Sequence, residues 1–515
     1  MILELGDFFM QENQKNKNAI FYLAGFNLFI CFFVMGSFVL HEHFSIDDYW
    51  IYDHQDSSAL NDISSNLRFV SGCLYYYLDR IGVNIVKNQI LFGILLICVF
   101  AWASTYISIE LAGSIGIQSS YKKLLLLNGG TLVMLLNVSL GEYLYFSGVY
   151  LQWAISLISM VIAAVCIGKE ENIRKNWTQG VLALSVTAGS YQIFIAQYAY
   201  LVMFIIYVRN KGCISRISVW AIIRAAGAAL TAVAVNLVCV QSFMRMGIVG
   251  HDSRMKFNLS EIPRLLVEIV QAQKIIWVEG IGVFPKYSLG FGLVLMLVTL
   301  GVCLYKRKAN AGEYIYIGIV LLSGQCVMWA AVVLQGNISV LLRMLSPVFG
   351  VFTVGVWMFS YYCRQDGRKL IQYPVIVAII LFLGFSSIKI QEIAVDTQIT
   401  NAVTKCYMQE IDSRISNYEK EYNVKVTKVG FCTDRYISYK FYNYIRSAAY
   451  GDFCYNPFLP SWSNITSLNF YSGRNLALTE VPEHIKRYYE NKNWDCANWD
   501  EQIYLNNDTV YICAF

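Results

Sequence analysis

Long apolar runs, each free or nearly free of charged residues, recur along the first three quarters of this chain. A helix needs about 20 such residues to cross the hydrocarbon core of a bilayer, so each run predicts a membrane-spanning helix. The first run, 19–40, is too long for a signal-peptide core and is predicted to be a retained anchor. The eleven predicted spans are 19–40, 89–107, 124–140, 143–168, 180–189, 192–208, 219–242, 288–305, 314–334, 345–362 and 374–389.

One of these assignments leaves an alternative open. The apolar stretch 180–208 is too long for a single span and contains Gly189-Ser190-Tyr191-Gln192. A short span and a normal span that meet at a membrane face explain it, and one long kinked helix is the other interpretation.

Basic residues predict the orientation, because short cytoplasmic loops collect Lys and Arg. Six clusters fall before the first span or in alternate connections, and all agree if the N-terminus is inside. The clusters are Lys15/Lys17, Lys122/Lys123, Lys169/Arg174/Lys175, Arg209/Lys211/Arg216, Lys306/Arg307/Lys308 and Arg364/Arg368/Lys369. The loop 41–88 and everything after about residue 389 then lie outside.

The pattern changes after residue 390, which divides the chain into a membrane domain, 1–390, and an external α/β domain, 391–515. Helical spacing is expected over 391–418, 434–449 and 481–492, and strands over 424–431 and 509–515. The expected fold is therefore a polytopic α-helical membrane protein with a small C-terminal domain outside the cell membrane. Composition agrees, because 56% of the residues are hydrophobic and only 15% are charged, against about 25% in soluble domains.

The loop 41–88 contains the highest density of candidate functional residues. Its first part holds six acidic residues and no Lys or Arg between positions 42 and 62. Asp47 and Asp48 lie just outside the first span, beside Tyr49 and Trp50. Adjacent carboxylates in a confined site do not both ionise cheaply, and a carboxylate near a sugar hydroxyl can act as a general base. Asp48 is slightly favoured over Asp47 as this base, because it adjoins the aromatic residues. Aromatic neighbours suit the apolar face of a sugar ring. A solvated acidic loop is the plainer interpretation.

Two further external residues are candidates. Arg343 opens a span, where a guanidinium can hold a phosphate with two hydrogen bonds; ordinary snorkelling is the alternative. Glu142 lies in a predicted tight external turn, as a second acid or as a helix cap. No paired Cys motif and no Asp-x-Asp motif occurs, so neither a metal nor another cofactor is implied.

The order of these features resembles the second Gtr group of glucosyltransferases, in the GT-C class of membrane-embedded glycosyltransferases. The motifs that carry the resemblance are Ser45-Ile-Asp-Asp-Tyr49, Leu67-Arg-Phe-Val-Ser-Gly72, Leu74-Tyr-Tyr-Tyr-Leu78, Ser190-Tyr-Gln192 and Tyr471-Ser-Gly-Arg-Asn475. The family pattern often has Gly before the loop Arg, where this chain has Leu67.

The resemblance implies an enzyme that moves a hexose, often glucose, from a polyprenyl-phosphate carrier to a cell-surface polysaccharide or its lipid-linked precursor. It implies substrate contacts by Arg68, Tyr191, Gln192 and Arg474. The expected partners are this lipid donor, the acceptor and the bilayer, with no nucleic acid. A polysaccharide polymerase or ligase is the first alternative, although the acidic cluster favours a transferase. A lipid-sugar transporter or flippase is the second, although such proteins usually carry charged groups inside the membrane.

Overall fold

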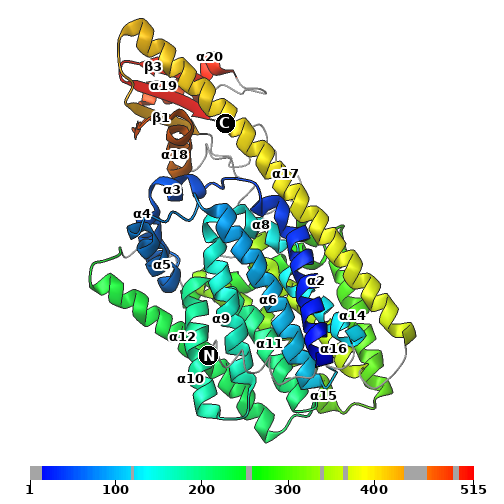
Figure 1. The fold of residues 1–515 in the computed structure, drawn as a ribbon. Coiled ribbons are helices and arrows are strands. Elements are labelled where there is room, and N and C mark those ends of the chain that lie inside the picture. Colours follow the sequence, from blue (N-terminus) through cyan, green and yellow to red (C-terminus); the bar gives the residue numbers. More distant parts are fainter. Residues whose placement is uncertain are drawn as a thin grey trace.

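The computed structural model shows a bundle of long helices with a small sheet region at one end (Figure 1). It describes residues 14–117, 121–250, 258–336, 341–363, 369–433, 461–490 and 498–514. Within these residues, eight helices are long and apolar enough to cross a membrane. They are α2 (Gln14–Val39), α6 (Gln89–Ile115), α9 (Tyr150–Gly168), α12 (Arg216–Arg245), α14 (Ser288–Lys306), α15 (Ala311–Gln335), α16 (Ser346–Tyr362) and α17 (Lys369–Tyr422).

The prediction of a helical membrane protein is therefore confirmed, and the remaining predicted spans are also helical. Helices α7 (Tyr121–Leu135) and α8 (Ser139–Tyr145) meet at a bend of 53° and make a ninth span if they are counted together. Helix α11 (Phe194–Arg209) has 16 residues, and α10 (Ile173–Ser190) is less apolar than the eight. The total of eleven spans stays a prediction.

The predicted interruption near Tyr191 separates α10 from α11. Tyr191 itself is extended, with φ −150° and ψ 102°. The Arg209 guanidinium at the end of α11 donates to the carbonyl oxygen of Gly168 at the end of α9. Helix α11 therefore returns to the end of the bundle from which α10 departs. The two helices are antiparallel, and the alternative of one long kinked helix is wrong.

Several of the basic connections come together at one end of the bundle. Arg209 lies 3.7 Å from Glu110 at the end of α6, and Arg307 lies 3.9 Å from Glu313 at the start of α15. The Tyr207 hydroxyl near the end of α11 donates to the same Glu313 carboxylate at 3.2 Å. The loop after the first span and the sheet region lie at the opposite end (Figure 1). This arrangement is the one that the positive-inside pattern requires.

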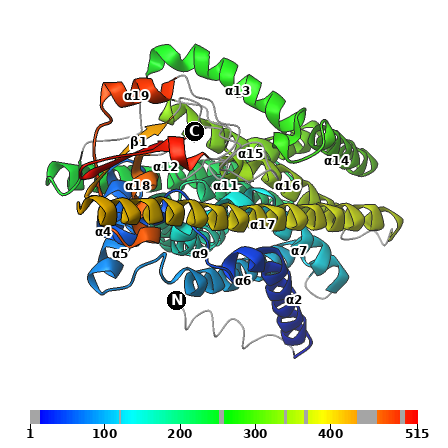
Figure 2. The ribbon, with the colours of Figure 1, turned by 90° about the horizontal axis from the view of Figure 1, so that it is seen from above.

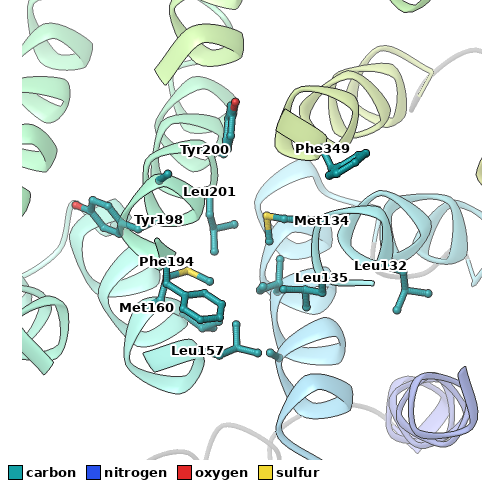
Figure 3. Close-up of a cluster of buried hydrophobic side chains, with 14 of the residues drawn as sticks. Leu132, Met134, Leu135, Leu157, Met160, Phe194, Tyr198, Tyr200, Leu201 and Phe349 are labelled. Carbon is teal, nitrogen blue, oxygen red and sulfur yellow. The ribbon is translucent and has the colours of Figure 1, made fainter. Parts of the chain in front are cut away.

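The core of the bundle is closed by aromatic and aliphatic side chains from α7, α9, α11 and α16 (Figure 3). The fully buried ring of Tyr200 packs against Gly324 of α15 and Gly350 of α16, where a Cβ atom would overlap the ring. Small residues at such contacts let helices approach closely, which is how helices gain packing energy inside a membrane.

Helix α17 runs for 54 residues, which corresponds to about 80 Å at 1.5 Å per residue. It continues without a break across the predicted domain boundary at 390/391, so no flexible linker separates the two parts. Ile393 packs on Gly141 of α8, just outside the bundle. Further along, Met408, Ile411 and Ile415 form a core with the sheet. One helix thus carries the sheet region at a fixed place (Figure 2).

The sheet has four strands in the order β2-β1-β4-β3, with β1 parallel to β2 and β4 and with β3 antiparallel to β4. The predicted strands 424–431 and 509–515 correspond to β1 and β4, and the predicted helix 481–492 corresponds to α19. The predicted helix 434–449 lies outside the described residues. The elements are β1 (Lys428–Thr433), α18 (Ser461–Ser472), β2 (Ala477–Leu478), α19 (Glu483–Glu490), α20 (Trp499–Gln502), β3 (Ile503–Asn506) and β4 (Thr509–Ala514).

The loop after the first span folds into three short helices, and another helix lies between α12 and α14. These are α3 (Asp48–Asp53), α4 (Gln55–Ser64), α5 (Phe69–Arg80) and α13 (Ile262–Trp277), with short 3-10 turns at Ser147–Val149, Leu259–Glu261, Gly280–Gly282 and Leu342–Leu345. Helix α13 exposes Leu266, Val267 and Val270 along one face.

Two natural cysteines test the orientation. Cys213 is exposed in a basic connection, and Cys406 is exposed on α17 near the sheet region. If the basic connections are cytoplasmic, a membrane-impermeant maleimide applied to intact cells labels Cys406, and Cys213 is labelled only after permeabilisation. Peptide mapping by mass spectrometry distinguishes the two sites. Labelling of Cys213 in intact cells would reverse the proposed topology.

Candidate functional site

Asp48 is a fully buried anchor between the loop after the first span and the connection from α8 to α9. One carboxylate oxygen accepts hydrogen bonds from the backbone N–H of Ser45 at 2.8 Å and of Ser147 at 3.2 Å. The other accepts from the N–H of Gly148 at 2.9 Å. A Cβ atom on Gly148 would approach Ile51 to 2.8 Å and this carboxylate to 3.0 Å. The close approach therefore requires glycine, and the three donors stabilise a charge that burial would otherwise penalise.

Asp47 is in a different setting, although it is the preceding residue. It is half-buried, and its Oδ1 accepts a hydrogen bond from the Trp462 indole N–H at 3.1 Å. Trp462 belongs to α18 of the sheet region and is 48% exposed. Asp47 therefore lies at the junction between the loop and the sheet region, with an aromatic ring beside it.

Tyr49 and Trp50 extend this junction in two ways. Tyr49 is fully buried, its ring stacks on Phe44 with centroids 5.1 Å apart, and its hydroxyl lies 3.0 Å from that of Tyr471. Burial raises the pKa of Tyr49 well above its ordinary value, and the neighbouring Tyr471 adds to the rise. Trp50 is half-buried and stacks on His54 with centroids 4.2 Å apart. Tyr49 thus joins the loop to α18, and Trp50 keeps part of its ring exposed.

Arg68, Tyr191 and Gln192 lie together at the loop between α4 and α5. The Arg68 guanidinium lies over the Tyr191 ring, 4.4 Å from its centroid. Its Nη1 atom is 3.4 Å from Gln152 Oε1 and 3.6 Å from Asp62 Oδ1, both long contacts. Its Nε–H is buried and has no hydrogen-bond partner among the described residues.

The backbone before Arg68 is held in an unusual conformation. Leu67 has φ +55°, in the left-handed region that favours glycine. Its carbonyl oxygen accepts hydrogen bonds from Gln192 Nε2 at 3.1 Å and from Asn236 Nδ2 at 2.8 Å. These two amides, from the α10–α11 connection and from α12, fix the direction in which Arg68 leaves the loop.

Glu142 and Arg343, both predicted as separate external candidates, form an ion pair. Arg343 donates from Nη1 to Glu142 Oε1 at 2.9 Å and from its backbone N–H to Oε2 at 2.7 Å. The Glu142 side chain is fully buried, and that of Arg343 is 20% exposed. Removing one partner of such a pair leaves a buried charge uncompensated, so the pair has a clear structural role.

These groups are neighbours at one end of the bundle. The Arg343 guanidinium lies 5.0 Å from the ring of Phe146, which directly precedes the Ser147 N–H that binds Asp48. Burial raises the pKa of Tyr75; Asp62 and, more weakly, Asp48 add to the rise, while Arg68 opposes it. The Tyr75 hydroxyl therefore lies within electrostatic reach of Asp48, Asp62 and Arg68.

Arg474 is not part of this cluster. Its guanidinium donates to Asp412, to Glu419 at 3.0 Å and to Ser416 at 2.8 Å. All three partners lie on α17, so Arg474 ties the segment after α18 to that helix. The structure gives it a supporting position in the sheet region instead of a place beside the other candidates.

Two residues of the site lack a role in the sequence-based prediction. Gln152, in the first turn of α9, donates to Asp62 at 2.7 Å and accepts from Arg68. Trp462 contacts Asp47 from a segment more than 400 positions away. A glutamine inside an apolar span is a signal that the sequence does carry, because polar side chains in spans are usually functional or paired. No local signal points to Trp462.

No family model, curated protein or solved structure matches the chain. Among the described residues, no group of three or more His, Cys, Asp or Glu side chains is arranged to hold a metal ion.

Asp48 should be more important for stability than its exposed neighbours. In Asp48→Asn the amide N–H2 faces backbone N–H donors, so at least one buried donor loses its acceptor at a cost of about 1–3 kcal/mol. We expect a lower apparent melting temperature of the detergent-purified protein. Asp53→Asn, at an exposed position of the same loop, is the control and should melt like the wild type. Equal melting of both variants would contradict the anchoring role.

Proposed function

We propose that the protein is a membrane-embedded glycosyltransferase that moves a hexose, with glucose as the first candidate, from a polyprenyl-phosphate carrier to a hydroxyl of a cell-surface polysaccharide or its lipid-linked precursor. The observation that carries the proposal is the gathering of aspartates, arginines and aromatic rings at one end of the bundle. A half-buried carboxylate, a cation with unsatisfied donors and an exposed indole ring are the groups that this transfer needs.

The family resemblance gains support from Leu67. At the position where the family pattern has glycine before the arginine, the backbone adopts φ +55°. A side chain there costs about 1–2 kcal/mol, and such strain is often retained at functional sites. The departure from the family sequence therefore preserves the backbone conformation that glycine would take.

We assign the general base to Asp47. Asp48 is saturated by three backbone donors inside the protein and does not face an incoming acceptor. Asp47 lies at the surface of the junction, beside Trp462. Because Tyr49 is buried within an aromatic cluster, the half-exposed rings of Trp462 and Trp50 are the ones that offer a face to a sugar.

We propose that Arg68, and not Arg343, binds the phosphate of the lipid donor. Arg343 already holds both oxygens of Glu142, whereas the contacts of Arg68 are long and its Nε–H is unsatisfied. A phosphate oxygen next to Arg68 would supply the missing acceptor in a charge-assisted hydrogen bond.

The proposed reaction transfers the hexose from the lipid phosphate to the acceptor hydroxyl in one displacement at C1. The acceptor hydroxyl oxygen forms a bond to C1 of the hexose, and its proton passes to the Asp47 carboxylate. The bond between C1 and the phosphate oxygen breaks, and the polyprenyl phosphate leaves with the electron pair. Its negative charge develops beside Arg68.

The base is tested by Asp47→Asn, which keeps size and removes the basic oxygen. Purified protein receives undecaprenyl-phosphate [¹⁴C]glucose and surface polysaccharide extracted from the native cells. We expect transfer by the wild type, no transfer from UDP-[¹⁴C]glucose, and a loss of about 10²–10⁴-fold in Asp47→Asn. Asp53→Asn should keep full turnover. Transfer from the nucleotide sugar alone would overturn the function, and normal turnover of Asp47→Asn would overturn the base.

The role of Arg68 in binding the donor phosphate is tested by the variant Arg68→Lys. A lysine keeps the charge but not the planar fork, so it does not reproduce the geometry of the guanidinium. We expect the KM for the lipid donor to rise about tenfold, which corresponds to one charge-assisted hydrogen bond of about 1.5 kcal/mol. Arg80→Lys changes an exposed arginine of the same loop and should leave the KM unchanged. An unaltered donor KM in Arg68→Lys would remove Arg68 from the site.

A further inference from the structure

A groove of about 640 Å³ opens between α2, α7 and the first turns of α17, far from the cluster described above. This size is within the range of about 300–1,000 Å³ that is typical of ligand pockets. Most of its lining is apolar and includes Phe26, Leu125, Ile376 and Ile380. Figure 2 shows the three helices from above.

The groove has its polar groups at one end. Lys122 and Lys123 open α7, and Gln372 and Tyr373 lie near the start of α17. Among the residues that the structure describes, the lining contains these two lysines and no carboxylate. The lysines lie in the predicted connection between α6 and α7, at the end of the bundle where basic residues gather.

The floor of the groove is closed by a satisfied polar network. Asn128, which lines the groove, exchanges side-chain hydrogen bonds with Asn27 of α2 at 2.8 and 3.0 Å. Ser108 of α6 donates to the same Asn128 at 3.0 Å. Because these amides are paired with each other, the charged group that we assign to a ligand is Lys122 at the mouth.

We propose that this groove binds an anionic phospholipid, with one acyl chain along the apolar lining and the phosphate beside Lys122. The membrane supplies this ligand, because anionic lipids are concentrated in the cytoplasmic leaflet and attract basic side chains near its surface. The site is separate from the proposed transfer reaction and does not depend on it.

Crosslinking in lipid nanodiscs tests the site with two probes. The full chain is embedded in nanodiscs of unlabelled phosphatidylcholine that contain a small fraction of a photoreactive lipid. This lipid carries a diazirine in its acyl chain and is phosphatidylglycerol in one sample and phosphatidylcholine in the other. We expect phosphatidylglycerol to crosslink mainly to peptides of α7 and the start of α17, and more strongly than phosphatidylcholine. Equal labelling by both lipids, or even labelling of α14, would overturn the proposal.

Two pairs of variants locate the ligand. Ile380→Trp fills the groove, whereas Leu381→Trp adds the same ring at a neighbouring lipid-facing position outside it; the two side chains are 62% and 67% exposed. Lys122→Gln removes a charge at the mouth, and Lys175→Gln removes an exposed charge in another basic connection.

We expect Ile380→Trp to abolish the crosslink and Lys122→Gln to lower it about fivefold, the effect of one basic residue beside anionic lipid. Both controls should match the wild type. Unchanged crosslinking in Ile380→Trp and Lys122→Gln would overturn the site. Stronger protection by unlabelled undecaprenyl phosphate than by unlabelled phosphatidylglycerol would overturn the phospholipid assignment. Transfer activity is not a readout here, so a failure of this site and a failure of the glycosyltransferase proposal are distinguishable.

Discussion

The continuity of α17 is the constraint that the architecture depends on. A single helix of 54 residues leaves the bundle and carries the sheet region, so the two parts are joined by a rod. Except at Pro374, which has no N–H to donate, the helix can satisfy its interior backbone hydrogen bonds within itself, both in the membrane and beyond it. Ile393 packs on α8, while Met408 and Ile411 pack on the sheet. The sheet region is therefore placed over the loop after the first span, and Trp462 reaches Asp47.

At the end of the bundle next to the sheet region, the buried carboxylates Asp48 and Glu142 each have specific hydrogen-bond or ion-pair partners. Asp48 accepts three hydrogen bonds from backbone N–H groups, and Glu142 forms an ion pair with Arg343. Each arrangement ties together segments that are far apart in sequence, at a place where an unpaired charge would be costly. The consequence is a difference between two adjacent aspartates. One carboxylate is held inside the fold by three backbone donors, and the other lies at the junction beside Trp462.

The spans were predictable because an apolar run of sufficient length has few alternatives in a membrane. The extent of α17 was not, because polar residues after position 390 resemble the start of a soluble domain, although they simply form the exposed face of the same helix. From the sequence, Asp48 is slightly favoured over Asp47 as the base, because Asp48 adjoins the aromatic residues, and the burial of Asp48 argues against that preference. Their difference arises from Ser147 and Gly148, about 100 positions away, and no local pattern encodes that contact. The same holds for Glu142 and Arg343, which are separated by 201 positions.

The unsatisfied hydrogen-bond donor of Arg68 links this fold to the proposed binding of a phosphate. A buried N–H without an acceptor costs about 1–3 kcal/mol, and Leu67 adds the cost of a left-handed backbone. Gln192 and Asn236 hold this conformation through the Leu67 carbonyl. The loop is thus kept in place by uncharged amides while the guanidinium stays incompletely bonded. An anion would recover part of this cost once the side chain turned its buried Nε–H toward it, because that atom has no solvent access in the present conformation.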